Sequence, residues 1–138
     1  MTPRFAGRRV LVTGSTRGVG IATARRFLDE GAEVILHGRS DAAVAAAAAT
    51  LGAAHRSRVS GHAADLGSRG EADRLAAFAG DLDILVNCAG IYEEVPVAEA
   101  DEAHWDRTIE VNVTAPFRLS RHLAAALARR SGVIVNVG

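Results

Sequence analysis

The feature that most constrains the fold is a glycine-rich turn between an apolar strand and a helix. Residues 10–12 are a short run that predicts a buried strand, and residues 18–30 carry apolar side chains at helical spacing. Between them the glycines follow the pattern Gly14-x-x-x-Gly18-x-Gly20. A strand that enters a helix through such a turn is typical of the first unit of a nucleotide-binding parallel sheet.

Each glycine has a predicted role in this turn. Gly14 permits a sharp exit from the strand, Gly18 lets the backbone approach a phosphate, and Gly20 lets the helix pack close to the sheet. The amides at the start of the helix then point toward a bound pyrophosphate, where the helix dipole favours negative charge. We expect the whole turn to bind a dinucleotide, through Gly14, Ser15, Thr16, Arg17, Gly18, Val19 and Gly20. The alternative is a plain strand-to-helix turn; a P-loop is excluded because no Gly-Lys-Ser/Thr follows.

The rest of the chain alternates between strands and helices. Apolar runs predict further strands at 33–37, 58–64, 82–86 and 133–137. Helices are expected at 18–30, 42–51, 68–78 and 101–130. This alternation predicts the α/β class, with a Rossmann-type doubly wound parallel sheet and helices on both faces. No repeat or linker divides residues 1–138, so we expect a single dinucleotide-binding domain.

Turn-forming residues set the expected ends of these helices. Gly31 and Gly52 stand where a left-handed residue would end the first and second helices, and Ser40 or Asp41 can cap the second. Pro116 lies inside the long fourth helical region, where its missing N–H and its ring disrupt a regular helix. We therefore expect a kink or an irregular turn in the four residues before this proline.

Composition removes several classes of function. The 16 basic and 16 acidic residues balance, so no net charge attracts nucleic acid or an anionic membrane. No stretch approaches the roughly 20 apolar residues that span a bilayer, and charged residues interrupt the N-terminus where a signal peptide needs an apolar core. Cys88 is the single cysteine, which fits a reducing compartment, so we expect a cytoplasmic protein. The five histidines lack metal-site spacing, and we predict no metal.

The residues after the second predicted strand indicate which dinucleotide binds. A site that prefers NAD usually has Asp or Glu there to hold the ribose 2′-hydroxyl, whereas residues 37–40 read His-Gly-Arg-Ser. Arg39 can instead pair with a 2′-phosphate, and Arg17 in the turn can reach the same group. Two arginines without a competing carboxylate favour NADP over NAD. The alternative is that both arginines are ordinary solvated surface residues.

Several spaced motifs occur together in this chain. They are Thr13-Gly14-x-x-x-Gly18-x-Gly20, Asp65-Leu66, Asn87-Cys88-Ala89-Gly90, Asn112 and the strand at residues 133–137. In this order they resemble the short-chain dehydrogenase/reductase family, especially its β-ketoacyl-carrier-protein-reductase-like members, over essentially the whole chain. The resemblance implies an oxidoreductase that uses NADP to reduce a small-molecule carbonyl reversibly to an alcohol. It also implies a homo-oligomer.

The resemblance implies roles for individual residues. Asp65 would accept a hydrogen bond from the adenine amine with the backbone of Leu66 beside it, and a helix cap is the local alternative for Asp65. Cys88 stands where the family has a second asparagine, and we expect a core thiol there rather than a nucleophile. The remaining residues of that motif would stabilise the sheet and lie along the cofactor: Asn87, Ala89 and Gly90.

Asn112 is similar to the asparagine of the family's catalytic tetrad. In the family, the backbone of this asparagine holds a water connected to the catalytic lysine, in a kinked helical region. An ordinary asparagine on a helix surface is the alternative. Of the tetrad, only Asn112 is predicted in this chain.

The other catalytic residues of the family have no counterpart here. In the family, the fifth strand leads into a catalytic serine and then a Tyr-x-x-x-Lys helix, which together orient the carbonyl and supply a proton. This sequence reaches Gly138 one residue before that serine, its single tyrosine is Tyr92, and it contains no lysine. We expect the cofactor-binding half of a longer enzyme, truncated after the fifth strand, with an uncovered edge there and no activity by itself. The alternative is a non-catalytic NADP-binding or sensing module.

Overall fold

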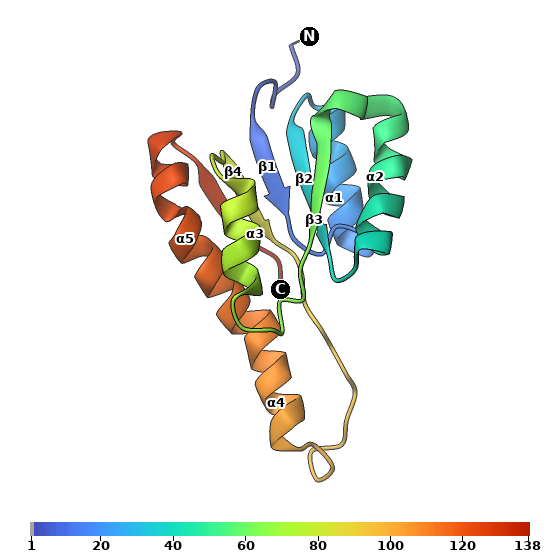
Figure 1. Cartoon of the computed structure of the whole chain (residues 1–138), viewed down its shortest axis with the longest axis vertical. Helices are drawn as coiled ribbons and strands as arrows, with labels where there is room; N and C mark the ends of the chain where they lie inside the picture. The colour runs from blue at the N-terminus through green and yellow to red at the C-terminus, as the bar shows by residue number, and fades with distance from the viewer. Residues whose placement is uncertain (1) are drawn as a thin grey trace.

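The predicted strands form one parallel sheet in the order β3-β2-β1-β4-β5 (Figure 1). The computed structural model describes residues 2–138. Within them the strands are β1 (Arg9–Val12), β2 (Glu33–Gly38), β3 (Val59–Ala63), β4 (Ile84–Asn87) and β5 (Val133–Asn136). Each neighbouring pair of strands is parallel. The predicted α/β class with a Rossmann-type sheet is therefore confirmed.

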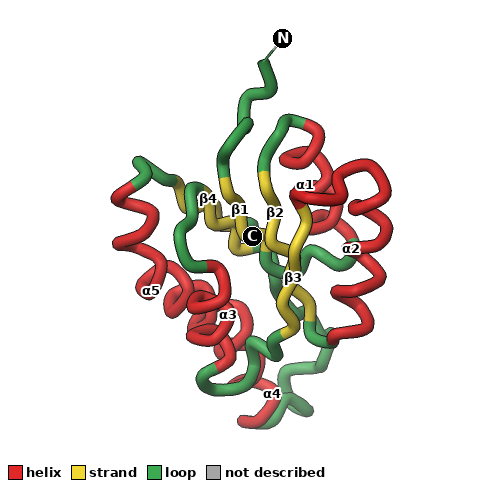
Figure 2. Tube along the Cα trace, turned by 45° about the horizontal axis from the view of Figure 1, so that its top comes forward, coloured by secondary structure: helices red, strands yellow, loops and turns green. Residues whose placement is uncertain are grey.

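Helices cover both faces of this sheet (Figures 1 and 2). They are α1 (Gly18–Asp29), α2 (Asp41–His55), α3 (Glu71–Ala79), α4 (Glu102–Ile109) and α5 (Ala115–Arg129). Side chains alternate along β1: Val10 and Val12 pack in the core beneath α1 and α2, whereas Leu11 packs in the core beneath α3 and α5. All three are completely buried, so β1 is the centre of both apolar cores.

The strand order creates a crevice at one end of the sheet. From the central β1 the chain builds β2 and β3 on one side, and then crosses to build β4 and β5 on the other. Ligands of open α/β sheets bind where the order reverses, outside the carboxyl ends of the strands. In Figure 1 these ends point downward, toward the long β4–α4 connection and α4 itself.

The end of the first helix and the cap of the second agree with the sequence prediction, whereas the end of the second helix differs from it. Gly31 has φ +95° and follows α1, and the Ser40 hydroxyl caps α2 by accepting from the Ala43 N–H at 3.2 Å. The prediction that Gly52 ends the second helix is wrong, because α2 continues to His55. Gly52 does not adopt a left-handed conformation, and the surrounding alanines favour helix strongly enough to carry it.

The third helix starts later than predicted. Its first residue is Glu71 rather than Ser68, because the preceding residues form a turn. Within that turn the Ser68 N–H donates to the Asp65 carbonyl at 2.9 Å, and Gly70 has φ +88°. A left-handed residue directly before α3 prevents the helix from extending further toward its N-terminus.

The long helical region is interrupted where the sequence predicts an irregular turn. α4 ends at Ile109, and a π-helical turn spans Glu110–Thr114 before α5 begins. The Ala115 N–H donates to the Glu110 carbonyl, five residues back. Pro116 is the second residue of α5 and has no N–H to donate to the carbonyl four residues earlier, which accounts for the irregular turn at this point. π-Helical turns of this kind frequently mark functional sites.

β5 forms the edge of the sheet beside β4, and all four of its residues are exposed. Its side chains include the large apolar residues Val133, Ile134 and Val135. Within residues 2–138 this edge is therefore uncovered, as expected from the strand order.

Candidate functional site

A cleft of about 890 Å³ opens at the carboxyl ends of the strands. It lies where the strand order reverses, the usual ligand site of this architecture. Most of the predicted cofactor residues line it: Gly14, Thr16, Arg17, Gly18, Val19, Gly20, Arg39, Asp65, Leu66, Ala89 and Gly90. The other predicted site residues, Ser15, Asn87 and Asn112, are not part of its lining. Ser15 and Asn112 hydrogen-bond to two residues that do line it, His37 and Ile91, and Asn87 joins β4 to β5.

Gly14 and Gly18 have the geometry that their predicted roles require, whereas Gly20 packs against the turn rather than against the sheet. Gly14 has φ +61°, and a Cβ at this position would lie 2.8 Å from the Ala89 Cα. Gly18 has φ +57° and open space where a Cβ would project, so a ligand can approach its backbone. A Cβ on Gly20 would overlap the Gly14 carbonyl oxygen. Gly20 therefore lets α1 start directly against the turn itself.

Hydroxyl groups anchor the turn to its neighbours. The Thr13 hydroxyl oxygen accepts from the N–H groups of Cys88 and Ala89, at 3.0 and 2.9 Å. The buried Ser15 hydroxyl donates to the Val12 carbonyl at 2.7 Å and accepts from the His37 N–H at 2.9 Å. The structure thus uses Ser15 to hold the turn in place rather than to line the cleft.

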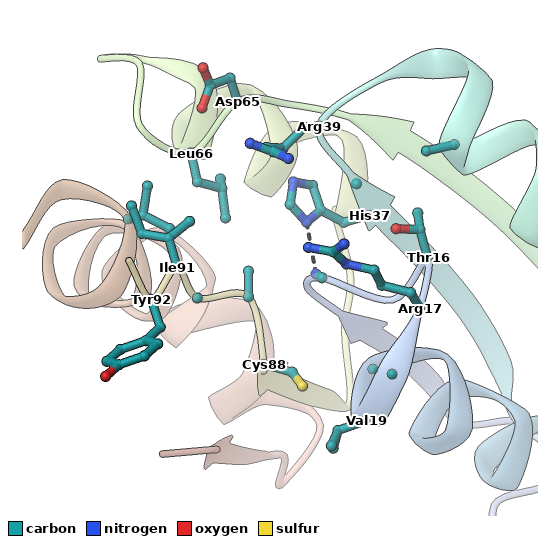
Figure 3. A pocket seen from close by; sticks show the side chains of 18 of the residues that line it. Thr16, Arg17, Val19, His37, Arg39, Asp65, Leu66, Cys88, Ile91 and Tyr92 are labelled. Carbon is teal, nitrogen blue, oxygen red and sulfur yellow. Dashed lines mark hydrogen bonds between the residues drawn. The ribbon is translucent and has the colours of Figure 1, made fainter. Parts of the chain in front are cut away.

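One end of the cleft carries two guanidinium groups. Arg17 comes from the turn and Arg39 from the residue after β2, and both side chains reach into the cleft (Figure 3). Neither forms an ion pair within residues 2–138. Ser40 lines the same end, and no carboxylate follows β2 directly. This end is therefore suited to an anionic group.

Asp65, which follows β3, lines the cleft near Arg39 (Figure 3). Its carboxylate accepts from the Gly67 N–H at 2.9 Å, and the Arg107 guanidinium of α4 lies 3.5 Å away. The Gly67 hydrogen bond, aided by Arg107, lowers the pKa of Asp65 and keeps it ionised. Asp65 therefore caps a local turn, whereas Gly70 occupies the N-cap position of α3. Arg107 also lines the cleft.

The segment after β4 is fixed by two asparagines. The Asn87 amide donates to Asn136 of β5 at 2.9 Å, joining the carboxyl ends of these strands. Asn112 holds Ile91 by both backbone groups: its amide oxygen accepts from the Ile91 N–H at 2.8 Å, and its NH₂ donates to the Ile91 carbonyl at 2.9 Å. Pro116 has no N–H with which an α-helix would satisfy the Asn112 carbonyl.

Two further residues lie in the wall of the cleft. Cys88, expected to be a core thiol, is half-buried: it packs against the core beneath α1 and α2 and also lines the cleft, and burial raises the pKa of its thiol. A raised pKa keeps the thiol protonated and argues against a nucleophilic role, as predicted. His37 is a residue of β2 whose ring is buried in the cleft wall, where it accepts a hydrogen bond from the Gly14 N–H (Figure 3).

Sequence reasoning missed His37 and Arg107 as parts of the site. The position of His37 at the carboxyl end of β2 is a signal that was available, since such ends line ligand sites in parallel sheets. Arg107 offers no comparable signal, because it meets Asp65 only through the packing of α4 against a loop 42 residues earlier.

Residues 2–138 contain no group of three or more His, Cys, Asp or Glu side chains that could hold a metal ion. Among the helices of the same residues, none has both the length and the apolar composition that crossing a membrane requires.

Comparison with known proteins identifies the family. A model of the family described as short chain dehydrogenase matches residues 8–138. The chain belongs to the short-chain dehydrogenase family. The resemblance seen in its motifs is thereby confirmed.

Individual members of the short-chain dehydrogenase family match over nearly the whole chain. An uncharacterized oxidoreductase of Bacillus subtilis is 43% identical, over 93% of this chain and 49% of its own length. The structure of L-sorbose reductase from Gluconobacter frateurii, complexed with NADPH and L-sorbose, matches with a TM-score of 0.91 and 31% identity, covering 99% of this chain and 54% of that one.

A 3-oxoacyl-(acyl-carrier-protein) reductase from Agrobacterium tumefaciens, solved with NADP bound, matches with a TM-score of 0.89 and 28% identity. That match covers 97% of this chain and 53% of the reductase. The chain therefore spans about half the length of the relatives it matches.

Proposed function

We propose that this chain is the cofactor-binding half of an NADP-dependent short-chain dehydrogenase/reductase. The parent protein would reduce a small-molecule carbonyl reversibly to an alcohol, with NADP supplying and accepting the hydride. The observation that carries the proposal is the placement of Arg17 and Arg39 at one end of the cleft, with arginine and serine rather than a carboxylate at the two positions directly after β2. Relatives solved with NADPH or NADP bound support it.

The residues of the cleft fit a dinucleotide from end to end. Gly18, open on its ligand side at the start of α1, would receive the pyrophosphate through backbone amides. Arg17 and Arg39 would hold the 2′-phosphate, because guanidinium groups match phosphate geometry. Asp65 would accept from the adenine amine, with Leu66 beside it. The remaining lining residues of the proposed site are Gly14, Thr16, Val19, Gly20, Ala89 and Gly90.

Asn112 is the one tetrad residue that we assign to the reaction, through its backbone carbonyl.

Proton transfer to the product oxygen needs an acid of suitable pKa at the reacting carbon. The single tyrosine, Tyr92, is 87% exposed, and these 138 residues contain no lysine that could act together with it. We therefore propose that a polypeptide of these residues binds the cofactor and does not turn it over.

The preference for NADP can be tested by titrating the protein with NADPH and NADH. Hydrogen bonds to a charged group contribute about 1.5–3 kcal/mol, so Arg39→Ala should weaken NADPH binding by roughly ten- to a hundredfold and leave NADH nearly unchanged. Arg25→Ala is the matched control, because it removes the same charge from an exposed part of α1 outside the cleft. Equal affinities for both cofactors, unaffected by Arg39→Ala, would refute the proposal.

A non-catalytic NADP-binding or sensing module is the second candidate function. Consumption of NADPH by the purified parent protein with any of a panel of ketones would exclude the sensor. Binding of NADPH without turnover in that protein would favour it. Three expectations stay predictions: residues 1–138 form a single domain, the protein is a homo-oligomer, and it is cytoplasmic.

A further inference from the structure

His37 is a buried residue of the cleft wall to which the proposed function assigns no contact with the cofactor. Its side chain is 2% exposed at the carboxyl end of β2, in the wall of the cleft. One ring nitrogen, Nδ1, lies 3.0 Å from the Gly14 amide nitrogen, and the other, Nε2, lies 2.8 Å from the Ala64 carbonyl oxygen. The imidazole thus bridges the glycine-rich turn to the segment that follows β3; Figure 3 shows its contact with the turn.

These two partners fix the protonation state of the ring. A backbone N–H can only donate and a backbone carbonyl can only accept, so Nδ1 must be unprotonated and Nε2 must carry the hydrogen. The bridge therefore exists only for the neutral imidazole. A second proton on Nδ1 would face the Gly14 N–H with another N–H, and the two groups would have to separate.

The Gly14 amide is a sensitive point for such a displacement. Gly14 has a left-handed conformation and contacts Ala89 so closely that a Cβ would not fit, and its carbonyl lies against Gly20 at the start of α1. The backbone of His37 holds the next residue as well, accepting from the Ser15 N–H at 2.8 Å. A shift of Gly14 therefore moves the turn, the Ala89 wall and the first amides of α1 together.

We propose that His37 is a positioning residue of the dinucleotide site, whose neutral ring holds the turn in its binding conformation and whose protonation releases it. Affinity for the cofactor then falls on acidification. The identity of the ligand rests on the proposed function, whereas the link between the ring and the turn does not.

The groups that face His37 oppose its protonation. Arg17 from the turn, Arg39 after β2 and Arg107 of α4 line the same cleft, and His62 is its partner in the register of β3. Asp65 is the one carboxylate in the lining near β3; it accepts a hydrogen bond from the Gly67 N–H and forms an ion pair with Arg107.

Burial, more than any neighbour, lowers the pKa of His37 below its ordinary 6.5. The neutral ring is therefore favoured at pH 7, and its protonation lies on the acid side of that value.

The protonation state can be read directly by nitrogen NMR of the imidazole in the full chain. We expect the Nε2–H tautomer at pH 7.5, and on acidification we expect the Gly14 amide resonance to shift with the same midpoint as the His37 ring. A ring protonated on Nδ1 at pH 7.5, or a Gly14 amide resonance that does not shift as the ring titrates, would overturn the proposal. Neither readout requires a bound cofactor.

Affinity measurements then test the effect on binding. NADH is the first probe, because it lacks the 2′-phosphate, which titrates near pH 6 itself. In the wild type the affinity should fall by up to about tenfold for each pH unit below the midpoint of His37. In His37→Asn, whose amide oxygen can accept from Gly14 at the position of Nδ1 and does not titrate, this fall should vanish. His37→Gln, which reaches toward Ala64 instead, should bind weakly at every pH.

His62→Asn is the matched control, since His62 lies beside His37 in the sheet and stacks on Phe78 outside the cleft. It should keep the fall in affinity on acidification, with a midpoint equal to or somewhat above that of the wild type, because His62 itself disfavours protonation of His37. The same fall in His37→Asn as in the wild type would overturn the proposal, and circular dichroism establishes that the variant is folded. If neither NADPH nor NADH binds the wild type, the proposed function fails, and the NMR titration still decides the role of His37.

Discussion

Two glycines inside helices, Gly20 and Gly52, differ in what a methyl group would meet. A Cβ on Gly20 would overlap the backbone carbonyl of Gly14, which cannot rotate away as a side chain could. A Cβ on Gly52 would meet nothing within 4 Å, and this glycine has an ordinary helical conformation within α2. The same substitution should therefore have opposite effects at the two positions.

We predict that Gly20→Ala lowers the free energy of unfolding by about 1–3 kcal/mol, as overpacking does elsewhere, and that it also weakens binding of NADPH. Gly52→Ala should raise the free energy of unfolding by up to about 1 kcal/mol, because alanine is the better helix former. Urea denaturation of both variants measures these changes. Destabilisation of similar size at both positions would show that Gly20 has no special packing role.

The glycine pattern illustrates what single residues reveal in the sequence. The close packing expected at Gly20 is present, although its immediate neighbour is the turn rather than the sheet. The hydrogen bonds of His37 and the approach of Arg107 to Asp65 were not predicted. They join residues that lie 23 to 42 positions apart, and no local pattern of residue types encodes such a pairing.

At the scale of elements, the π-helical turn between α4 and α5 presents Asn112 to the segment after β4. We predict that Asn112→Ala exposes the Ile91 amide to hydrogen exchange, because it removes both contacts with the Ile91 backbone. Both hydrogen bonds are exposed, so each should contribute a free energy near the lower limit of the usual range of about 0.5–1.5 kcal/mol. Exchange at Ile91, followed by mass spectrometry or NMR, measures the effect.

Two variants sharpen this test. Asn112→Asp keeps an acceptor for the Ile91 N–H but loses the donor to its carbonyl, so protection should be intermediate. Val113→Ala changes an exposed neighbour in the same turn and should leave Ile91 protected. Unchanged exchange at Ile91 in Asn112→Ala would mean that the segment is held by other contacts.

Elements were predictable where local chemistry decides them. The strands, the cap at Ser40, the end of α1 at Gly31 and the irregular turn before Pro116 all follow from residue types that permit few conformations. The ends of α2 and α3 were not predictable in the same way. Gly52 is compatible with either helix or a helix end, and the turn before α3 depends on hydrogen bonds of Asp65.

At the scale of the whole molecule, Asp83 joins three strands at the end of the sheet opposite the cleft. It directly precedes β4 and is 2% exposed. Its carboxylate accepts from the Arg9 N–H of β1 and from the guanidinium groups of Arg8 and Arg130, at 2.9 to 3.0 Å. Its carbonyl accepts from the Val133 N–H at the start of β5. Through its side chain and its backbone carbonyl, this one residue ties together the amino ends of β1, β4 and β5.

Burial is the largest influence on Asp83 and opposes its ionisation, yet the hydrogen bonds from Arg130, Arg9 and Arg8 together outweigh it and lower its pKa to about 2. In the unfolded chain its pKa returns to about 3.9. Because the folded pKa is the lower one, the stabilisation is complete above the unfolded value and is lost as the pH falls toward 2. The shift corresponds to about 2 kcal/mol at neutral pH.

We therefore predict that Asp83→Asn lowers the free energy of unfolding by about 2 kcal/mol or more at pH 7, because it also leaves Arg8 and Arg130 without their partner. The difference from the wild type should shrink as the pH falls from 4 toward 2. Asp81→Asn is the matched control, since Asp81 is 69% exposed and pairs with an exposed Arg129, so its loss should change stability by less than about 1 kcal/mol. Urea denaturation at pH 7 and pH 3 separates the two variants. Equal effects of both substitutions at pH 7 would mean that the ends of the three strands are held together by their backbone hydrogen bonds alone.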